Sequence, residues 1–140
     1  MVQIFDGCYV LKSFMILLSI ILLVFMVSCD DLDVQEVAVY RRISAEDAFE
    51  MMQNSKDYII LDVRTEGEFN SEHIDGAILI PDNEIGDRVT NELPNKNALI
   101  LIYCRSGRRS EAAAHELVEM GYTNVYDFGG ILNWPYDTVP

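Results

Sequence analysis

The chain has 140 residues, half of them hydrophobic, which is enough for one domain with a real core. It carries 23 acidic and 10 basic side chains, a formal net charge of −13, and this balance argues against nucleic acid as a partner. Three of the basic residues, Arg105, Arg108 and Arg109, nevertheless lie in one short stretch. We therefore expect a local positive site for a small anion in an otherwise negative molecule.

Residues 1–28 are predicted to be a signal peptide. Residues 14–27 are apolar apart from Ser19, a run shorter than the ~20 residues of a membrane span but typical of a signal-peptide core. The run closes on Ser28-Cys29, and here the sequence resembles a bacterial lipoprotein signal, which is cut before a cysteine that becomes lipid-modified. Met26 in place of the usual leucine and the acidic Asp6 leave an uncleaved anchor or a misassigned upstream start as alternatives.

The lipoprotein resemblance implies that Cys29 carries acyl chains, each buried methylene contributing about 0.8 kcal/mol to membrane attachment. The acidic residues 29–36 would then be a tether. In that case the domain is exported and anchored on the outer face of a membrane, in the periplasm or at the cell surface.

The count of cysteines singles out Cys104. Of the three cysteines, Cys8 leaves with the signal peptide and Cys29 is expected to be acylated. An unpaired thiol in a compartment that permits disulfides is either buried and inert or kept for its reactivity. The neighbours of Cys104 decide between these two.

From residue 37 to the end, short apolar runs alternate with amphipathic stretches, which is the α/β pattern. Ser44 with Asp47 and Thr65 with Glu68 have the spacing of capping boxes, which start helices. The apolar run 98–103 is typical of a central strand of a parallel sheet, buried on both faces. The predicted strands are 37–40, 58–63, 78–80, 98–103 and 125–127. The predicted helices are 44–53, a short one after Thr65, 84–93 and 110–120, the last with Ala112, Ala113, Leu117 and Met120 on one face.

Cys104 directly follows the predicted central strand, at the edge of a parallel sheet where ligands bind. A helix beginning just beyond it supplies free N–H groups and the positive end of a helix dipole, which stabilise a thiolate. Gly107 allows the backbone to curl around an anion. We predict that Cys104 is a nucleophile activated by a lowered pKa, and that His73 and His115 are structural.

Several motifs recur in the order and spacing of a known family. They are Ile59 to Arg64, Glu66 to Phe69, His73 to Ala77, Cys104 to Ser110, and Gly129-Gly130-Ile131 with Trp134. Together they resemble a single rhodanese domain from about Val39 to the end. The most specific motif is the loop Cys-Arg-Xaa-Gly-Xaa-Arg at 104–109. Glu72 departs from the family, which usually has glycine before the histidine, but this position touches a turn and not the loop.

The rhodanese resemblance implies an α/β domain over residues 37–140, with a central, mostly parallel sheet and helices on both faces. It also implies a ping-pong sulfur transfer. The thiolate of Cys104 takes the outer sulfur of a small anionic donor such as thiosulfate, and a thiol or cyanide acceptor removes it from the persulfide. The resemblance implies no metal and no organic cofactor, and we expect a monomer.

Further roles follow from the same resemblance. The loop residues Arg105, Ser106, Gly107, Arg108 and Arg109 are expected to bind the donor. Within this loop the backbone cradles the persulfide, the first and last arginines hold the anion, and the middle one faces either the donor or solvent. Asp62 and Arg64 either brace the site or form a purely structural ion pair, and Trp134 either packs in the core or covers the site.

Two rival functions share this fold. Phosphatases and arsenate reductases of similar fold have a loop one residue longer, with arginine six positions after the cysteine. Here Ser110 occupies that position and Arg109 precedes it, so a tetrahedral phosphate is expected to fit poorly. The other rival is a non-catalytic module that carries or binds sulfur, against which the intact Cys104 and the basic loop argue.

Overall fold

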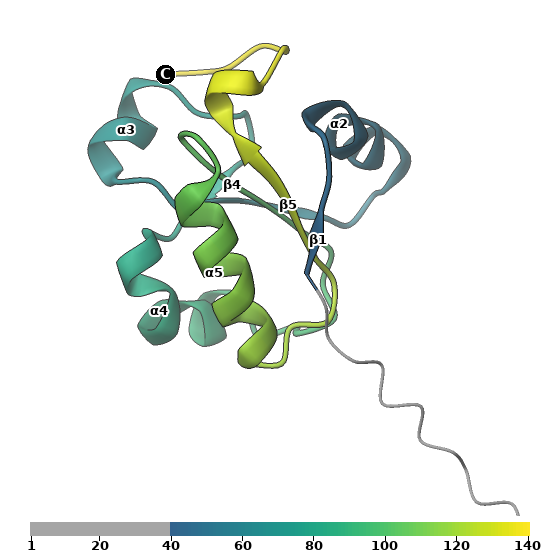
Figure 1. The fold of residues 1–140 in the computed structure, drawn as a ribbon, viewed down its shortest axis with the longest axis vertical. Coiled ribbons are helices and arrows are strands. Elements are labelled where there is room, and N and C mark those ends of the chain that lie inside the picture. The colour runs from purple at the N-terminus through teal and green to yellow at the C-terminus, as the bar shows by residue number, and fades with distance from the viewer. Residues whose placement is uncertain (1–39) are drawn as a thin grey trace, which may run out of the picture. The chain divides into compact units, whose positions relative to one another are not determined.

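The computed structural model describes residues 40–140; the predicted signal peptide, Cys29 and the predicted tether lie outside the described residues. These residues form a five-stranded sheet in which every pairing is parallel (Figure 1). The strands, in their order across the sheet, are β1 (Arg41–Arg42), β5 (Val125–Gly130), β4 (Ile100–Cys104), β2 (Ile59–Asp62) and β3 (Ile78–Leu79). The helices are α2 (Ala45–Asn54), α3 (Glu66–Ser71), α4 (Ile85–Glu92) and α5 (Arg108–Glu119), with short 3₁₀ helices at Asp82–Glu84 and Ile131–Asn133.

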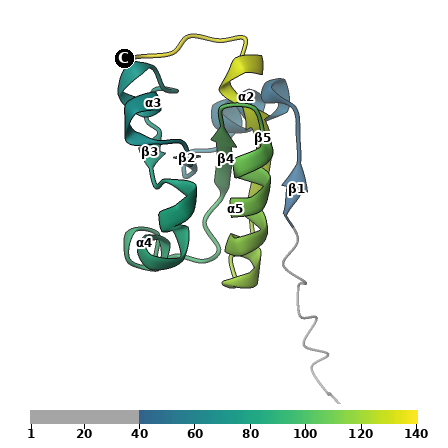
Figure 2. The ribbon, with the colours of Figure 1, turned by 60° about the vertical axis from the view of Figure 1, so that its left-hand side comes forward.

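Helices cover both faces of the sheet, as predicted, and divide the core in two (Figures 1 and 2). On one face α4 and α5 bury a cluster that includes Val89 and Leu117. On the other face α2 and the carboxyl-terminal segment pack on a second cluster. All five residues of β4 are buried and alternate between the two clusters, so the prediction of a doubly buried central strand is confirmed.

The first strand differs from the prediction. Residues 37–39 lie outside the described part of the chain, Tyr40 is not in a strand, and the strand consists of Arg41 and Arg42, which pair with Tyr126 and Asp127. Two exposed arginines at the edge of a sheet have no apolar alternation, which is the signal used to predict strands. The pairing is set by contact with β5, which is distant in sequence.

The helix starts follow their capping chemistry. Both predicted capping boxes are present, at Ser44 with Asp47 and at Thr65 with Glu68. The last helix, in contrast, begins at Arg108 and not at Ser110, with Gly107 as its N-cap.

The buried face of α5 also differs from the prediction. It consists of Ser110, Ala113, Ala114 and Leu117, whereas Ala112 is exposed and Met120 lies at the carboxyl-terminal cap. Ala113 and Leu117 were predicted correctly. The sheet and α4 select which of three consecutive alanines are buried, and composition alone does not distinguish them.

Candidate active site: the Cys104 loop

Cys104 is the last residue of β4 and its sulfur lies under the loop that leads into α5. It is a free thiol with 1% of its surface exposed. The register between β4 and β5 shifts after Ile102, so that Cys104 lies opposite Gly130. Such an irregularity bends a strand and redirects a side chain, and here it lies next to the Cys104 sulfur.

Two glycines make the close packing of this loop possible. Gly107 has φ = 104°, a left-handed conformation that favours glycine, and its N–H lies 3.1 Å from the Cys104 sulfur. Gly130 faces the other side of the loop, where an added Cβ would lie 2.6 Å from Cα of Ser106. The loop backbone therefore rests directly on β5.

The surroundings of Cys104 lower its pKa. Burial alone raises the pKa, but hydrogen bonds from the backbone N–H and hydroxyl of Ser110, and from the N–H groups of Gly107 and Ser106, lower it by more. The Ser110 hydroxyl also lies 3.1 Å from the carbonyl oxygens of Gly107 and Gly129. It has one proton to donate, so the three backbone N–H groups are the constant donors to the thiolate. The N–H groups of Gly107, the N-cap, and of Ser110, in the first turn of α5, have no intrahelical partners, and that of Ser106 lies in the loop just before the helix.

The predicted donor-binding residues lie around this sulfur but in different situations. Arg105, Ser106 and Arg108 are exposed, and neither of these arginines is in an ion pair within residues 40–140. Arg105 lines a cavity of about 360 Å³ next to the loop. The other residues that line it are Arg64, Glu68, Ser71, Glu72, Ile131 and Leu132.

Arg109 has a partner that the sequence did not predict. Its Nη1 and Nη2 donate to Oε2 and Oε1 of Glu68, at 2.8 and 2.7 Å, in a bidentate ion pair. The hydrogen bonds of Arg109 and Thr65 lower the pKa of Glu68 to about 2 against the opposing effect of burial. That Arg109 binds the donor stays a prediction, and the pair with Glu68 competes with it.

Asp62 and Arg64 form the buried ion pair that the sequence suggested. The Arg64 Nη2 donates to Asp62 Oδ2 at 2.7 Å and to the carbonyl of Glu72 at 2.6 Å, and both side chains are almost fully buried. Burial lowers the pKa of Arg64, but the hydrogen bonds and charge of Asp62 raise it by more. The pair thus ties the end of β2 to the turn after α3, which forms one wall of the cavity.

A second ion pair behind the loop was missed. Nη1 of Arg42 donates to the buried Asp127 at 2.8 Å, and Nη2 of Arg42 approaches Gly107 and Gly129 so closely that a Cβ on Gly107 would lie 2.7 Å from it. An aspartate within the apolar run 125–128 was a signal that this carboxylate is buried and needs a partner. Nothing in the sequence identified Arg42 as that partner.

The two histidines and Trp134 have packing partners away from the sulfur. His73 Nδ1 lies 3.0 Å from the carbonyl of Phe69 and its ring stacks on Phe69, while His115 contacts Tyr40. Trp134 packs against the second core cluster, so the packing interpretation is confirmed.

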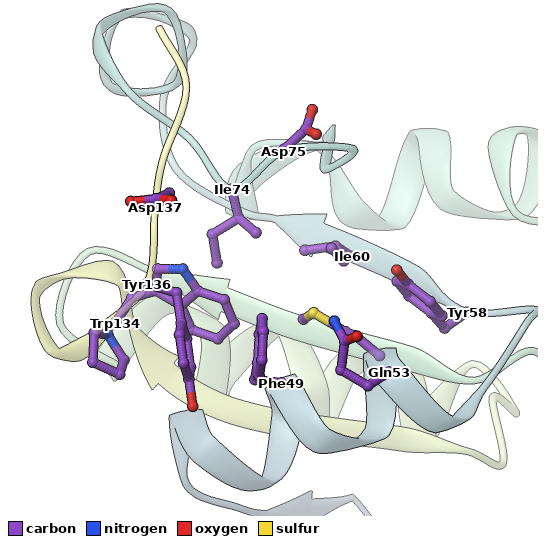
Figure 3. A pocket seen from close by; sticks show the side chains of 11 residues that line it. Phe49, Gln53, Tyr58, Ile60, Ile74, Asp75, Trp134, Tyr136 and Asp137 are labelled. Atoms are coloured by element: carbon purple, nitrogen blue, oxygen red, sulfur yellow. The ribbon is translucent and has the colours of Figure 1, made fainter.

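A separate cavity of about 490 Å³ lies between α2 and the carboxyl-terminal segment (Figure 3). Aromatic side chains line it, among them Phe49, which stacks on Tyr136 with the ring centroids 3.8 Å apart. Nε1 of Trp134 is buried and has no hydrogen-bond partner among the described residues. No residue of the Cys104 loop lines this cavity.

Residues 40–140 contain no cluster of three or more histidine, cysteine, aspartate or glutamate side chains placed to hold a metal ion. Among the helices of this described part, none is both long enough and apolar enough to span a membrane.

Comparison with known proteins gives one consistent family. The family model described as "Rhodanese-like domain" matches residues 44–135. The chain is 42% identical over 71 residues to thiosulfate sulfurtransferase PspE of Escherichia coli, covering 51% of this chain and 68% of that protein. It is 32% identical over 97 residues to thiosulfate sulfurtransferase GlpE of Coxiella burnetii, covering 69% and 88%.

Solved structures agree in fold. A rhodanese with anions from E. coli has a TM-score of 0.56 and 38% identity, covering 59% of this chain and 96% of that one. A rhodanese-related protein from Thermoplasma volcanium has a TM-score of 0.62 and 31% identity, covering 71% and 98%.

Proposed function

The chain belongs to the rhodanese-like family, and from this premise we propose that it is a sulfurtransferase that carries sulfur as a persulfide on Cys104. One observation carries the proposal: the Cys104 sulfur lies at the end of β4 beneath backbone N–H groups that lower its pKa. Similarity to relatives named thiosulfate sulfurtransferase supports the same reaction class.

The proposed reaction needs no oxidant, because the donor sulfur is transferred at its existing oxidation level: one S–S bond forms while another breaks. The Cys104 thiolate attacks the outer sulfur of thiosulfate, a new S–S bond forms, and the electron pair of the broken S–S bond leaves with sulfite. The N–H groups of Ser106, Gly107 and Ser110 that stabilise the thiolate then stabilise the persulfide anion. An acceptor thiol or cyanide attacks the outer sulfur and restores the thiolate.

The rival functions are less well supported. A phosphatase of similar fold needs an arginine at position 110, but here Ser110 is buried and its hydroxyl lies against backbone carbonyls. A module that only binds sulfur would not need a cysteine with a lowered pKa. A lowered pKa favours the thiolate, which is the form that attacks a donor.

We also propose that the domain is exported and held at a membrane by acyl chains on Cys29. The support is the apolar run of residues 14–27 that ends at Ser28-Cys29. This part of the proposal is independent of the chemistry at Cys104.

The test of the chemistry is the mass of the intact protein. After treatment with thiosulfate the mass should rise by one sulfur atom, and cyanide should reverse the gain with formation of thiocyanate. Cys104→Ala should fold, take up no sulfur and lose turnover. Turnover retained by folded Cys104→Ala would exclude the mechanism.

A further inference from the structure

The bidentate pair between Glu68 and Arg109 is a fixed part of the site. Oε2 of Glu68 also accepts hydrogen bonds from the N–H of Thr65 at 3.1 Å and from its hydroxyl at 2.9 Å. The Glu68 and Arg109 side chains are only 25% and 19% exposed. Glu68 is therefore held by the first turn of α3 in the position that receives the Arg109 guanidinium, and the pair joins α3 to the first turn of α5.

Arg109 lies in the first turn of α5, directly after the loop whose Gly107 N–H donates to the Cys104 sulfur. The hydrogen bonds of Glu68 are the main cause that raises the pKa of Arg109, and the charge of Cys104 adds to it in the same direction. A carboxylate bonded to both Nη atoms of Arg109 offsets most of the arginine's positive charge. The anion that reaches Cys104 thus meets a weaker field than an unpaired arginine would give.

The other arginines near the loop are neutralised in the same way. Arg64 is paired with Asp62, and Arg42 with Asp127. Of the loop arginines, Arg105 and Arg108 are free of ion pairs within the described residues, and Arg105 alone lines the cavity next to the loop. Glu68 and Glu72 line the same cavity, so its charge is mixed and not strongly positive.

We propose that Glu68 is a specificity-determining residue, which holds Arg109 in an ion pair and so shifts the site from dianionic sulfur donors towards donors with a single negative charge. The inference rests on the proposed sulfurtransferase function and names the donor class of the same site. The physical reason is the charge that accumulates during transfer. Attack of the thiolate on thiosulfate gathers three negative charges at the site, whereas attack on a monoanionic donor gathers two. A weaker positive field penalises the first reaction more.

Methanethiosulfonate is a monoanionic probe with the same transferable sulfur. The Cys104 thiolate attacks its outer sulfur, the S–S bond of the probe breaks, and methanesulfinate leaves with the electron pair. Charge balances, with two negative charges before and after the step. Thiosulfate and methanethiosulfonate therefore compare donors that differ in charge while the transferred atom is the same.

The variant Glu68→Gln tests the proposal, because glutamine keeps an oxygen for the Thr65 cap but removes the charge. We expect kcat/KM for thiosulfate to rise roughly 5- to 10-fold, and that for methanethiosulfonate to rise about twofold or less. The matched control is Glu72→Gln. It removes one negative charge from the same cavity, but from a carboxylate that forms no ion pair within residues 40–140. It should change kcat/KM for both donors by the same small factor.

The double variant Glu68→Gln/Arg109→Gln tests whether the effect passes through Arg109. It should return the ratio of the two donors to the parental value, because the charge released by the first change is removed by the second. Three outcomes would each overturn the proposal: a ratio of kcat/KM for thiosulfate over methanethiosulfonate that stays raised in the double variant, the same change of this ratio in Glu72→Gln, or no change of it in Glu68→Gln. If the parent protein turned over neither donor, the proposed function itself would be refuted.

A measurement on the parent protein keeps the proposal testable even where a variant does not fold. Sulfate and methanesulfonate resemble the leaving groups of the two donors and differ in charge. If the ion pair with Glu68 keeps Arg109 from binding other anions, sulfate should inhibit no more than a few-fold more strongly than methanesulfonate. Inhibition by sulfate that is roughly 100-fold stronger would show that Arg109 is available to dianions, and would overturn the assignment.

Discussion

Burial raises the pKa of Cys104, but hydrogen bonds from backbone N–H groups and from the Ser110 hydroxyl outweigh burial and lower it. We therefore expect the alkylation rate of Cys104 by iodoacetamide to reach half its maximum at a lower pH than that of an ordinary cysteine, because the pKa is lowered and the thiolate is the reactive form. Ser110→Ala, which removes the hydroxyl but keeps the N–H, should raise this midpoint only part of the way. A midpoint in the parent at or above that of free cysteine would contradict this account of the site.

Arg105 and Arg108, which form no ion pair within residues 40–140, should differ in their effect on the donor. Arg105→Ala should lower kcat/KM for thiosulfate roughly 10- to 150-fold, the value of one hydrogen bond to a charged group, because Arg105 lines the cavity next to the loop. Arg105→Lys should recover part of the loss, since lysine keeps the charge but not the planar fork.

Arg108→Ala is the matched control, because it removes the same charge from a residue that does not line the cavity. Steady-state kinetics at low and high salt should show a small loss that salt screens. Equal losses in the two alanine variants would mean that the total charge of the loop, and not a contact of Arg105, attracts the donor.

At the scale of single residues, the sequence predicted what lies close along the chain. Cys104 and the loop that activates it are contiguous, and the Asp62–Arg64 pair spans two residues, so a local pattern was sufficient. The pairs Arg109–Glu68 and Arg42–Asp127 are separated by 41 and 85 residues. Such pairs are fixed by the packing of strands and helices, which a single sequence does not show.

At the scale of elements, the junction of β4, the loop and α5 depends on the absence of a side chain at Gly130. Gly130→Ala should push a methyl group into the backbone of Arg105 and Ser106, and cost about 1–3 kcal/mol of the free energy of unfolding. Because the displaced segment carries the N–H donors of Cys104, sulfur transfer should fall with it. Denaturant unfolding and turnover of the same preparation measure both effects.

Gly67→Ala is the control for this substitution. Gly67 lies in α3 and an added Cβ would have no atom within 4 Å, so alanine should stabilise the protein by about 0.5–1 kcal/mol. Stability and activity that respond alike in the two variants would show that Gly130 has no special contact with the loop.

The elements that bury apolar surface were predicted, and so was α3, which buries no residue and is marked in the sequence by its capping box. β2 and β4 are short continuous apolar runs, and α2 and α4 carry apolar residues at helical spacing, which marks these four elements in the sequence. β1 consists of two exposed arginines and has no such period. The start of α5 was misplaced because Gly107 caps it through a left-handed backbone and not through a side chain that the sequence would reveal.

For the molecule as a whole, the ion pair of Glu68 links acid stability to the site. Because the pKa of Glu68 is lowered from 4.5 to about 2, its contribution to stability is present above about pH 4.5 and is lost as the pH falls towards about 2. Glu68→Gln should therefore lose less stability than the parent across this interval in urea unfolding curves. Glu72→Gln, which breaks no ion pair of the described domain, should follow the parent.

The proposed membrane attachment of the domain depends on Cys29. If the cysteine is lipid-modified, the parent should fractionate with membranes, and Cys29→Ala should be released or keep its signal peptide. Labelling with a radioactive fatty acid distinguishes the two forms directly. Membrane fractionation and peptide length unchanged by Cys29→Ala would indicate an ordinary transmembrane anchor.

The two outer strands of the sheet, β1 and β3, are each two residues long and lie at opposite edges (Figure 2). An unpaired strand edge is a template on which another chain can add a strand, and its length sets how many hydrogen bonds the added strand gains. Both edges here are very short, and the arginines of β1 place charge on one of them. Even at high local concentration, copies of this domain should not aggregate by joining their sheets, although β2 and β4 between the edges are strongly apolar.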